Sequence, residues 1–321
     1  MMRDIKKIAV IGAGYMGGGI AQSLALGGYD VLIADADEEK SAQALDRLIK
    51  EAQEFEDQEL YPAGATEIIK GKLTNGGTIA NAVTGADFIE EAVFELPDVK
   101  KEVLREICEY APEDAIIGTN TSTLPVTSLK SAVTNPQRFL TVHFSNPAPF
   151  IPGVELVASE DTSSEVIAAV KVLLEHCGRQ GAQVADKPGF VLNRLQYALL
   201  KEACNVVEEG VATVEDVDTI VRTTFGFRLG FFGPFAIADQ AGLDVYANCF
   251  KTFENTYGER LATPELLTKE VSAGRNGVKN GKGITGDFDD ETKEALIAYR
   301  NNAYSKMQSL LNELGPAPKG K

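Results

Sequence analysis

Residues 8–17 read Ile-Ala-Val-Ile-Gly-Ala-Gly-Tyr-Met-Gly. The four apolar residues at the start are typical of a short buried strand, and residues 20–26 after the glycines have the pattern of a helix. Gly27 and Gly28 end that helix, and the apolar run at 31–34 predicts a second strand. This order of strand, glycine-rich turn, helix and strand predicts a Rossmann-type, doubly wound, mostly parallel sheet that binds a dinucleotide.

The glycine-rich turn contains the residues Gly12, Gly14, Tyr15, Met16 and Gly17, which we predict to bind the cofactor. Gly12 permits the tight bend, Gly14 lets the backbone approach a pyrophosphate, and Gly17 allows the helix to pack closely on the strand. The pyrophosphate would lie at the helix N-terminus, where free N–H groups and the helix dipole favour an anion. A glycine-rich turn without a ligand is the structural alternative.

Asp35 ends the second predicted strand, 18 residues after Gly17, where a carboxylate can accept hydrogen bonds from the adenosine ribose. No arginine follows it, and the next charged residues are Asp37, Glu38 and Glu39. These carboxylates would repel the 2′-phosphate of NADP. We therefore predict NAD as the cofactor.

The residue pattern most suggestive of catalysis surrounds His143, one of only two histidines in the chain. His143 closes the apolar run 139–142, a proline-containing loop follows, and a second run begins at Glu155. If the two runs pair, imidazole and carboxylate lie close together, and such a pair can transfer protons near neutral pH. The alternative is a strand-end histidine whose hydrogen bond is structural.

Two further polar positions follow predicted strands. Residues 87–95 predict a strand that ends at Glu95, a candidate neighbour of the cofactor or substrate, or a helix cap. The strand predicted at 115–118 is followed by Thr-Asn-Thr-Ser-Thr at 119–123, which could cap a helix or place Ser122 against a reacting oxygen.

A length of 321 residues favours two domains, and we place the boundary at the Asp-Lys-Pro-Gly segment, giving domains 1–187 and 188–321. Residues 41–83 are predicted to be helical, with an interruption at Pro62 and Gly64 and another short helix at 65–73. The acidic stretch 51–59 is predicted to be a solvated helix face. Apolar residues at helical spacing after residue 190 predict an all-helical C-terminal domain.

Composition excludes several classes of protein. Asp and Glu outnumber Lys and Arg by 47 to 31, and the net charge of −16 argues against nucleic acid or an anionic membrane as partner. No apolar segment is long enough to span a bilayer, and the N-terminus shows no signal-peptide pattern. The four cysteines are far apart, which predicts no metal site and suits reduced thiols in the cytoplasm.

Six segments have a combined spacing that is specific. They are Gly-Ala-Gly-Tyr-Met-Gly (12–17), Glu-Ala-Val-Phe-Glu (91–95), Asn-Thr-Ser-Thr-Leu (120–124), the block 143–155, Lys-Pro-Gly-Phe-Val-Leu-Asn-Arg (187–194) and Asn-Gly-Lys-Gly (280–283). With these segments the chain resembles the L-3-hydroxyacyl-CoA dehydrogenase superfamily over nearly its whole length. The resemblance implies an NAD-dependent enzyme whose helical C-terminal domain forms a homodimer.

The resemblance also implies roles for individual residues. His143 would be the catalytic base and Glu155 its partner, while Ser122 and Asn193 would hydrogen-bond the reacting oxygen of the substrate. The remaining residues implied on the cofactor side are Glu95, Lys100, Asn120, Asn146 and Lys279.

The resemblance leaves the substrate open. The segments 150–155, 190–198 and 232–235 are more like the branch that acts on CoA-free substrates, of the gulonate, carnitine or pyridine-carboxylate type. The acyl-CoA members of the family present basic residues to the CoA phosphates from the arm after the second strand, and the acidic stretch 51–59 in that arm weakens a CoA site. Asp-Gln-Ala-Gly-Leu-Asp at 239–244 is instead similar to the acyl-CoA members. We expect a 3-hydroxyacyl-CoA such as 3-hydroxybutyryl-CoA, with a CoA-free 3-hydroxy acid or related alcohol as the alternative. A non-catalytic NAD(H)-binding protein is the third hypothesis.

Overall fold

A computed structural model describes residues 5–318 of the chain. The chain divides into two compact units, unit 1 (Met1–Leu199) and unit 2 (Leu200–Lys321). Helix α8 (Leu192–Glu208) begins in unit 1 and ends in unit 2. The domain boundary predicted at 187/188 falls in the turn that precedes α8, and it stays a prediction.

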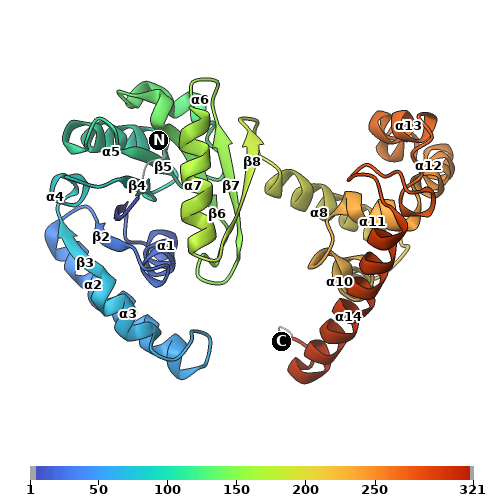
Figure 1. The fold of residues 1–321 in the computed structure, drawn as a ribbon, viewed down its shortest axis with the longest axis horizontal. Helices are drawn as coiled ribbons and strands as arrows, with labels where there is room; N and C mark the ends of the chain where they lie inside the picture. The colour runs from blue at the N-terminus through green and yellow to red at the C-terminus, as the bar shows by residue number, and fades with distance from the viewer. Residues whose placement is uncertain (1–4, 319–321) are drawn as a thin grey trace. The chain divides into compact units, whose positions relative to one another are not determined.

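Unit 1 is built on an eight-stranded sheet with the order β3-β2-β1-β4-β5-β6-β7-β8 (Figure 1). Every neighbouring pair is parallel except β6 and β7, which are antiparallel. The predicted doubly wound, mostly parallel sheet is therefore confirmed. The strands are β1 (Lys7–Ile11), β2 (Asp30–Ala34), β3 (Leu73–Gly77), β4 (Phe88–Glu91), β5 (Ile116–Thr119), β6 (Phe139–Phe144), β7 (Gly153–Ala158) and β8 (Gln180–Ala185).

Helices cover both faces of this sheet, and each face has its own apolar core. One core includes α1 and α7, and the other includes α4, α5 and α6. The helices of unit 1 before α8 are α1 (Tyr15–Leu26), α2 (Glu38–Asp57), α3 (Ala65–Lys72), α4 (Ile79–Val83), α5 (Pro97–Tyr110), α6 (Val126–Leu129) and α7 (Ser164–His176). Two short 3₁₀ segments are η1 (Lys130–Ala132) and η2 (Pro136–Arg138).

The structure corrects two boundaries. Residues 73–77, expected to be helical, form edge strand β3, because pairing with β2 overrides a Thr-Asn-Gly-Gly segment that carries little strand signal. The strand expected to reach Glu95 ends at Glu91, because the N–H of Val93 turns back to the Glu91 carboxylate at 2.8 Å.

Strand β4 is buried on both faces, as expected for a parallel strand between helices. Glu90 shares its face with Phe88, and no described residue bonds either oxygen of its carboxyl group. Complete burial, reinforced by the charge of neighbouring Glu91, raises the pKa of Glu90 well above its ordinary value. Gly118 leaves the space for this side chain, since a Cβ there would stand 2.2 Å from Oε2 of Glu90.

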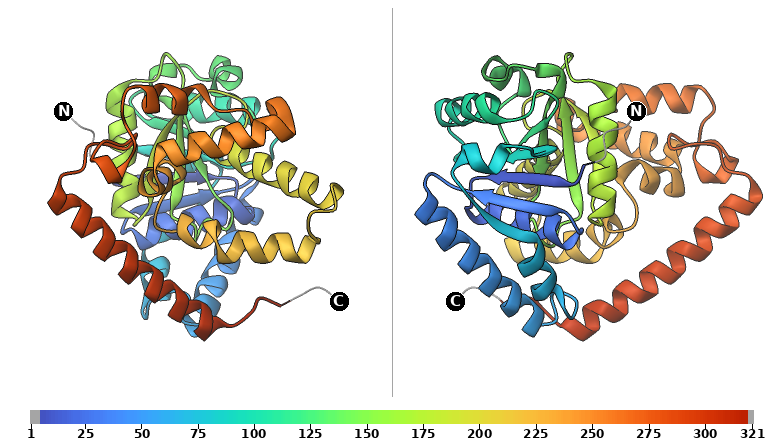
Figure 2. Two further views of the ribbon diagram at one scale, coloured as in Figure 1. Left: turned by 90° about the vertical axis from the view of Figure 1, so that its right-hand side faces the viewer. Right: turned by 60° about the vertical axis from the view of Figure 1, so that its left-hand side comes forward.

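Unit 2 is helical, as predicted. Its helices after α8 are α9 (Val214–Thr223), α10 (Phe225–Leu229), α11 (Pro234–Ala241), α12 (Leu243–Tyr257), α13 (Glu265–Ser272) and α14 (Asp290–Leu314), with 3₁₀ segments η3 (Gly258–Leu261) and η4 (Val278–Asn280). Helix α14 is one unbroken helix of 25 residues (Figure 2). Among residues 5–318, no helix combines the length and the apolar character needed to cross a membrane.

Candidate active site

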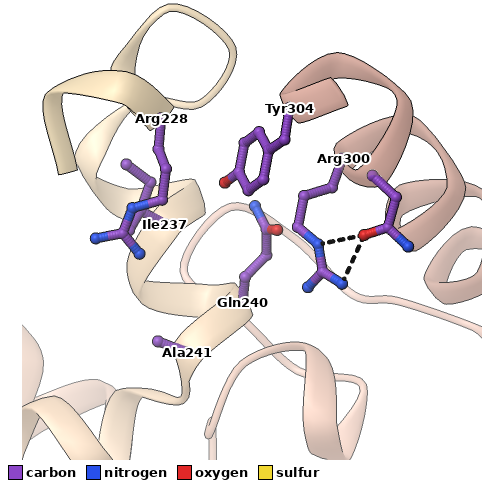
Figure 3. A pocket seen from close by; sticks show the side chains of 7 residues that line it. Arg228, Ile237, Gln240, Ala241, Arg300 and Tyr304 are labelled. Carbon is purple, nitrogen blue, oxygen red and sulfur yellow. Dashed lines mark hydrogen bonds between the residues drawn. The ribbon is translucent and has the colours of Figure 1, made fainter. Parts of the chain in front are cut away.

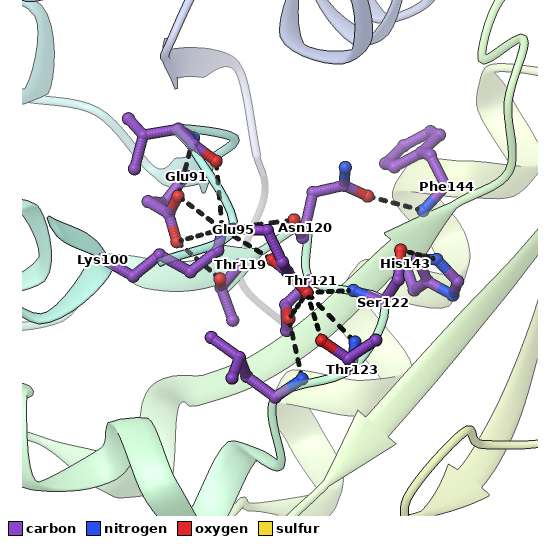
Figure 4. Close-up of polar contacts among 12 residues, drawn as sticks. Glu91, Glu95, Lys100, Thr119, Asn120, Thr121, Ser122, Thr123, His143 and Phe144 are labelled. Carbon is purple, nitrogen blue, oxygen red and sulfur yellow. Dashed lines mark hydrogen bonds and ion pairs between the residues drawn. The ribbon is translucent and has the colours of Figure 1, made fainter. Parts of the chain in front are cut away.

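A carboxylate, an imidazole and a hydroxyl stand in line beside the antiparallel pair β6 and β7. His143 and Glu155 are register partners, and Nδ1 of His143 lies 2.9 Å from Oε2 of Glu155. On the other side of the ring, Nε2 lies 3.0 Å from Oγ of Ser122 (Figure 4). His143 is 5% and Glu155 9% exposed. With Nδ1–H donating to the carboxylate, Nε2 is left to accept a proton.

The second carboxylate oxygen of Glu155 holds the start of helix α8. Oε1 accepts hydrogen bonds from the backbone N–H groups of Val191 and Leu192, at 2.8 and 2.9 Å. A negative charge is favoured at this end of a helix because the first N–H groups have no partner within it. Glu155 is therefore fixed from two sides, and its position in turn fixes the ring of His143.

One residue just before α8 and one in its first turn complete the surroundings of His143. Phe190, which is buried, packs edge-on against the imidazole with ring centroids 5.7 Å apart. Asn193 lies in the first turn of α8, and its Nδ2 donates to the backbone oxygen of Ser122 at 3.2 Å. All four predicted catalytic residues belong to one hydrogen-bonded group, which consists of His143, Glu155, Ser122 and Asn193.

The glycine-rich turn has the geometry that a pyrophosphate needs. Gly12 has φ +97°, and a Cβ there would stand 2.7 Å from the backbone of Ala92. At Gly17 a Cβ would stand 1.8 Å from the carbonyl oxygen of Gly12, so the helix approaches the turn as closely as backbone allows. Beside Gly14 the space is open, and no side chain caps the N-terminus of α1. The free N–H groups there fit a bound anion.

A cavity of about 490 Å³ opens beside this turn. Predicted site residues that line it are Gly12, Gly14, Tyr15, Met16, Asp35, Glu95, Asn120 and Ser122. Asp35 follows β2, and its Oδ2 accepts a hydrogen bond of 2.7 Å from the N–H of Ala13. Ser122 lines the cavity and bonds Nε2 of His143, so one hydroxyl group connects the imidazole to the cavity wall. The size is within the range of small-molecule sites.

Glu95 organises the loop that carries Ser122. Its Oε1 accepts hydrogen bonds from Oγ1 of Thr121 at 2.6 Å, from N of Ser122 at 2.9 Å and from N of Thr123 at 3.0 Å. Burial disfavours the charged form of Glu95, but these hydrogen bonds and the charge of Lys100 outweigh it and lower its pKa. An ionised carboxylate thus sets the position of the serine hydroxyl.

Lys100 does not line the cavity. Its side chain is fully buried, and its Nζ bonds Oε1 of Glu91 at 2.9 Å and the carbonyl oxygen of Asn120 at 3.3 Å (Figure 4). Oε2 of Glu91 also accepts a hydrogen bond of 2.5 Å from the hydroxyl group of Thr119. Sequence reasoning missed Glu91 as a member of this group, although an acidic residue in an otherwise apolar strand pattern was the available signal.

Three further residues predicted to bind the cofactor, Asn120, Asn146 and Lys279, lie in three different parts of the chain. Oδ1 of Asn120 accepts a hydrogen bond of 2.9 Å from the N–H of Phe144, which leaves its amide N–H groups available. Asn146 is exposed in the loop after β6. Lys279 belongs to unit 2, where its Nζ lies 2.6 Å from Oδ2 of Asp244.

Comparisons with known proteins identify the family of the chain. Residues 7–187 match the family described as 3-hydroxyacyl-CoA dehydrogenase, NAD binding domain, and residues 189–286 match 3-hydroxyacyl-CoA dehydrogenase, C-terminal domain. The chain is 35% identical over 302 residues to the 5-formyl-3-hydroxy-2-methylpyridine 4-carboxylate 5-dehydrogenase of Mesorhizobium japonicum, covering 92% of this chain and 95% of the relative.

Two further relatives are similar over most of their length. A Bacillus subtilis protein named "Probable 3-hydroxybutyryl-CoA dehydrogenase" is 34% identical over 292 residues, covering 90% of this chain and 99% of the relative. The crystal structure of a 3-hydroxyacyl-CoA dehydrogenase from Archaeoglobus fulgidus matches with a TM-score of 0.77 and 32% identity, covering 97% of this chain and 99% of that one. The chain therefore belongs to the 3-hydroxyacyl-CoA dehydrogenase family of NAD-dependent oxidoreductases.

Proposed function

We propose that the enzyme interconverts an L-3-hydroxyacyl-CoA, such as 3-hydroxybutyryl-CoA, and the corresponding 3-ketoacyl-CoA. The observation that carries this proposal is the bonded row of Glu155, His143 and Ser122 beside the cavity of the glycine-rich turn. When bound, NAD supplies the hydride acceptor. The chain must then supply a proton acceptor and donors for the reacting oxygen, and this row contains both kinds of group.

In the oxidative direction, Nε2 of His143 takes the proton of the substrate hydroxyl. Glu155 stabilises the resulting imidazolium through the 2.9 Å bond to Nδ1. In the reverse direction, the imidazolium returns the proton to the oxygen. Ser122 and Asn193 act as donors toward that oxygen, and the amide of Asn193 has a second N–H beyond the one bonded to Ser122.

The proposed cofactor contacts follow the cavity wall. The N-terminus of α1 holds the pyrophosphate, and Asp35 accepts bonds from the ribose. Glu95 and Asn120 approach the nicotinamide half, and Lys100 acts through Glu95, which lies 3.7 Å from its Nζ. Asn146 and Lys279 remain proposed contacts on the strength of the resemblance alone.

A CoA-free 3-hydroxy acid or related alcohol is the second candidate substrate. The four basic residues of the α2–α3 arm that could receive CoA phosphates are each paired with an acid. The pairs are Arg47 with Glu51 (2.8 Å), Lys50 with Glu54 (3.8 Å), Lys70 with Glu67 (2.7 Å) and Lys72 with Asp30 (2.8 Å). Such surface pairs are weak individually, so they reduce the attraction for phosphate without blocking it. The Mesorhizobium japonicum relative carries a name that describes a CoA-free substrate.

The deciding experiment is NADH oxidation with acetoacetyl-CoA, run beside free acetoacetate, dehydrocarnitine and 3-keto-gulonate. Turnover of the thioester alone, with kcat/KM of about 10⁴–10⁸ M⁻¹s⁻¹, supports the acyl-CoA proposal. Turnover of a free acid alone supports the second candidate. Tight NADH binding without turnover of any of these compounds contradicts both.

The role of His143 has a matched control in this chain. His143→Gln should lose about 10²–10⁴ in kcat, the usual contribution of a general acid–base. His176→Gln removes the other histidine, which lies at the C-terminus of α7 and bonds the hydroxyl of Tyr29. That variant should keep full activity, and an equal loss in both variants would contradict the assignment.

We also propose a cytoplasmic homodimer formed through the C-terminal domain. In unit 2, no residue of helix α9 is buried, and the apolar side chains of Val214 and Ile220 are 65% and 58% exposed. Helices with an exposed apolar stripe are typical of subunit interfaces. Light scattering should give twice the mass of one chain, and the mass of a single chain would contradict the dimer.

The four cysteines are unpaired, which supports a reducing compartment.

A further inference from the structure

Unit 2 contains a second cavity, of about 400 Å³, lined by polar side chains from three helices. Arg228 comes from α10, Gln240 from α11, and Arg300 and Tyr304 from α14. Figure 3 shows the Tyr304 ring and the Gln240 carboxamide between the two arginines. The proposed chemistry of unit 1 uses none of these residues.

Both arginines line the same cavity, and no described carboxylate forms an ion pair with either. Elsewhere in unit 2, Arg260 pairs with Glu209 at 2.7 Å and Arg275 pairs with Asp287 at 2.9 Å. The hydrogen bonds of the Arg300 guanidinium go to the neutral side chain of Asn301, at 3.2 and 3.1 Å. In a chain of net charge −16, two guanidinium groups that line one cavity without an acidic partner point to an anion from outside the chain.

The cavity wall is held in place by an aromatic group. The ring of Tyr304 packs against Phe227, Phe231 and Phe232, with centroids 5.5, 6.2 and 6.3 Å apart. Such packing leaves the tyrosine few alternative positions, so its hydroxyl group is fixed at the cavity. Nε2 of Gln240 donates to the carbonyl of Ala236 at 3.3 Å, which orients its carboxamide. Donors that are fixed before binding lose little entropy when a ligand arrives.

We propose that this cavity binds a small organic anion through its carboxylate, with Arg228 and Arg300 as the charged donors. A guanidinium matches the two oxygens of a carboxylate in a planar, bidentate geometry. Ile237 and Ala241 give the cavity an apolar side that suits the carbon skeleton of an organic acid. Inorganic phosphate shares the charge but has no carbon to place there.

Calorimetric titration of the full-length protein tests this proposal. Succinate is the probe, with neutral succinamide and inorganic phosphate at the same ionic strength as comparisons. The variants are Arg228→Gln and Arg300→Gln, and the matched control is Arg222→Gln, which removes an exposed arginine of α9. Tyr304→Phe is a milder variant that keeps the ring packing. Circular dichroism verifies that each variant folds.

Succinate should bind once per chain, more tightly than phosphate, and succinamide should not bind. Each cavity arginine variant should weaken succinate by roughly tenfold or more, because charged hydrogen bonds are lost. Tyr304→Phe should weaken it less, and Arg222→Gln should leave it unchanged.

Three results would overturn the proposal. The first is no succinate binding up to about 10 mM, which is about ten times the Kd of a weak, 1 mM ligand. The second is binding that survives both cavity variants, or that favours phosphate over succinate. The third is a change in oligomeric mass in these variants with unchanged succinate binding, which would assign the arginines to a contact between chains.

Discussion

Replacing Glu155 with glutamine tests how the carboxylate supports His143. The amide oxygen of glutamine can still accept the N–H groups of Val191 and Leu192, so the start of α8 keeps its hydrogen bonds. The amide N–H₂ then faces Nδ1 of His143, where the carboxylate stood at 2.9 Å. An N–H donor at Nδ1 favours the tautomer that carries its proton on Nε2, which is the wrong form for a base.

The expected magnitude follows from the geometry. An imidazolium and a carboxylate with charge centres about 4 Å apart attract by roughly 4 kcal/mol at an effective dielectric constant near 20. The pair is almost completely buried, so solvent screens it little. At about 1.36 kcal/mol per factor of ten, the loss in kcat is on the order of 10³.

The assay is steady-state NADH oxidation with whichever of the four keto compounds the enzyme turns over, combined with fluorescence titration of NADH. We expect kcat to fall while the dissociation constant of NADH stays the same, because Glu155 contacts no residue of the glycine-rich turn. Glu175→Gln removes an exposed carboxylate of α7 and serves as the control for the charge change. A Glu155→Gln enzyme with nearly unchanged kcat would refute the reasoning.

Three further predictions concern the interior of unit 1. Glu90→Met should raise thermal stability, because the pKa of Glu90 is raised in the folded protein. The gain in unfolding free energy over the wild type should grow by about 1.4 kcal/mol per pH unit, in the range where the unfolded carboxyl is ionised and the folded one is still protonated. A gain that shrinks with rising pH would contradict this. Gly17→Ala should lower both the melting temperature and NADH affinity, because its Cβ has no room, whereas Gly14→Ala, with open space around it, should weaken NADH by about tenfold without lowering the melting temperature. Equal melting temperatures for Gly17→Ala and Gly14→Ala would contradict the difference in space at the two glycines. Thr121→Val removes a hydrogen bond that lowers the pKa of Glu95, so that pKa should rise when followed by carboxyl NMR, and an unchanged titration would assign the shift to other neighbours.

The sequence predicted correctly those parts of unit 1 whose residues are close together along the chain. The turn at 12–17 lies between β1 and α1 as expected, because its glycines, strand and helix are neighbours in the sequence. His143 and Glu155 pair because a single loop joins their strands. Strand β3 was missed, since its stability comes from β2, some forty residues earlier, rather than from its own side chains.

Groups assembled from distant segments could not be predicted from the sequence alone. The resemblance implies a role for Lys100 beside the cofactor, but its ion pair with Glu91 depends on how helix α5 packs on strand β4. The cavity that contains Arg228 and Arg300 was equally unpredictable, because the two arginines come from different helices and belong to no local motif. Charge and hydrophobicity along the chain do not say which buried ions will meet, because that depends on how the elements pack.

The small number of histidines makes the state of the proposed base directly visible. Labelling with ¹⁵N-histidine would place signals on two imidazole rings only, those of His143 and His176. One ring is buried between a carboxylate and a hydroxyl, and the other bonds Tyr29 at the surface, so their nitrogen shifts should separate without any substitution. The tautomer of His143 could then be followed as cofactor and substrate are added, with His176 as the internal reference in the same spectrum.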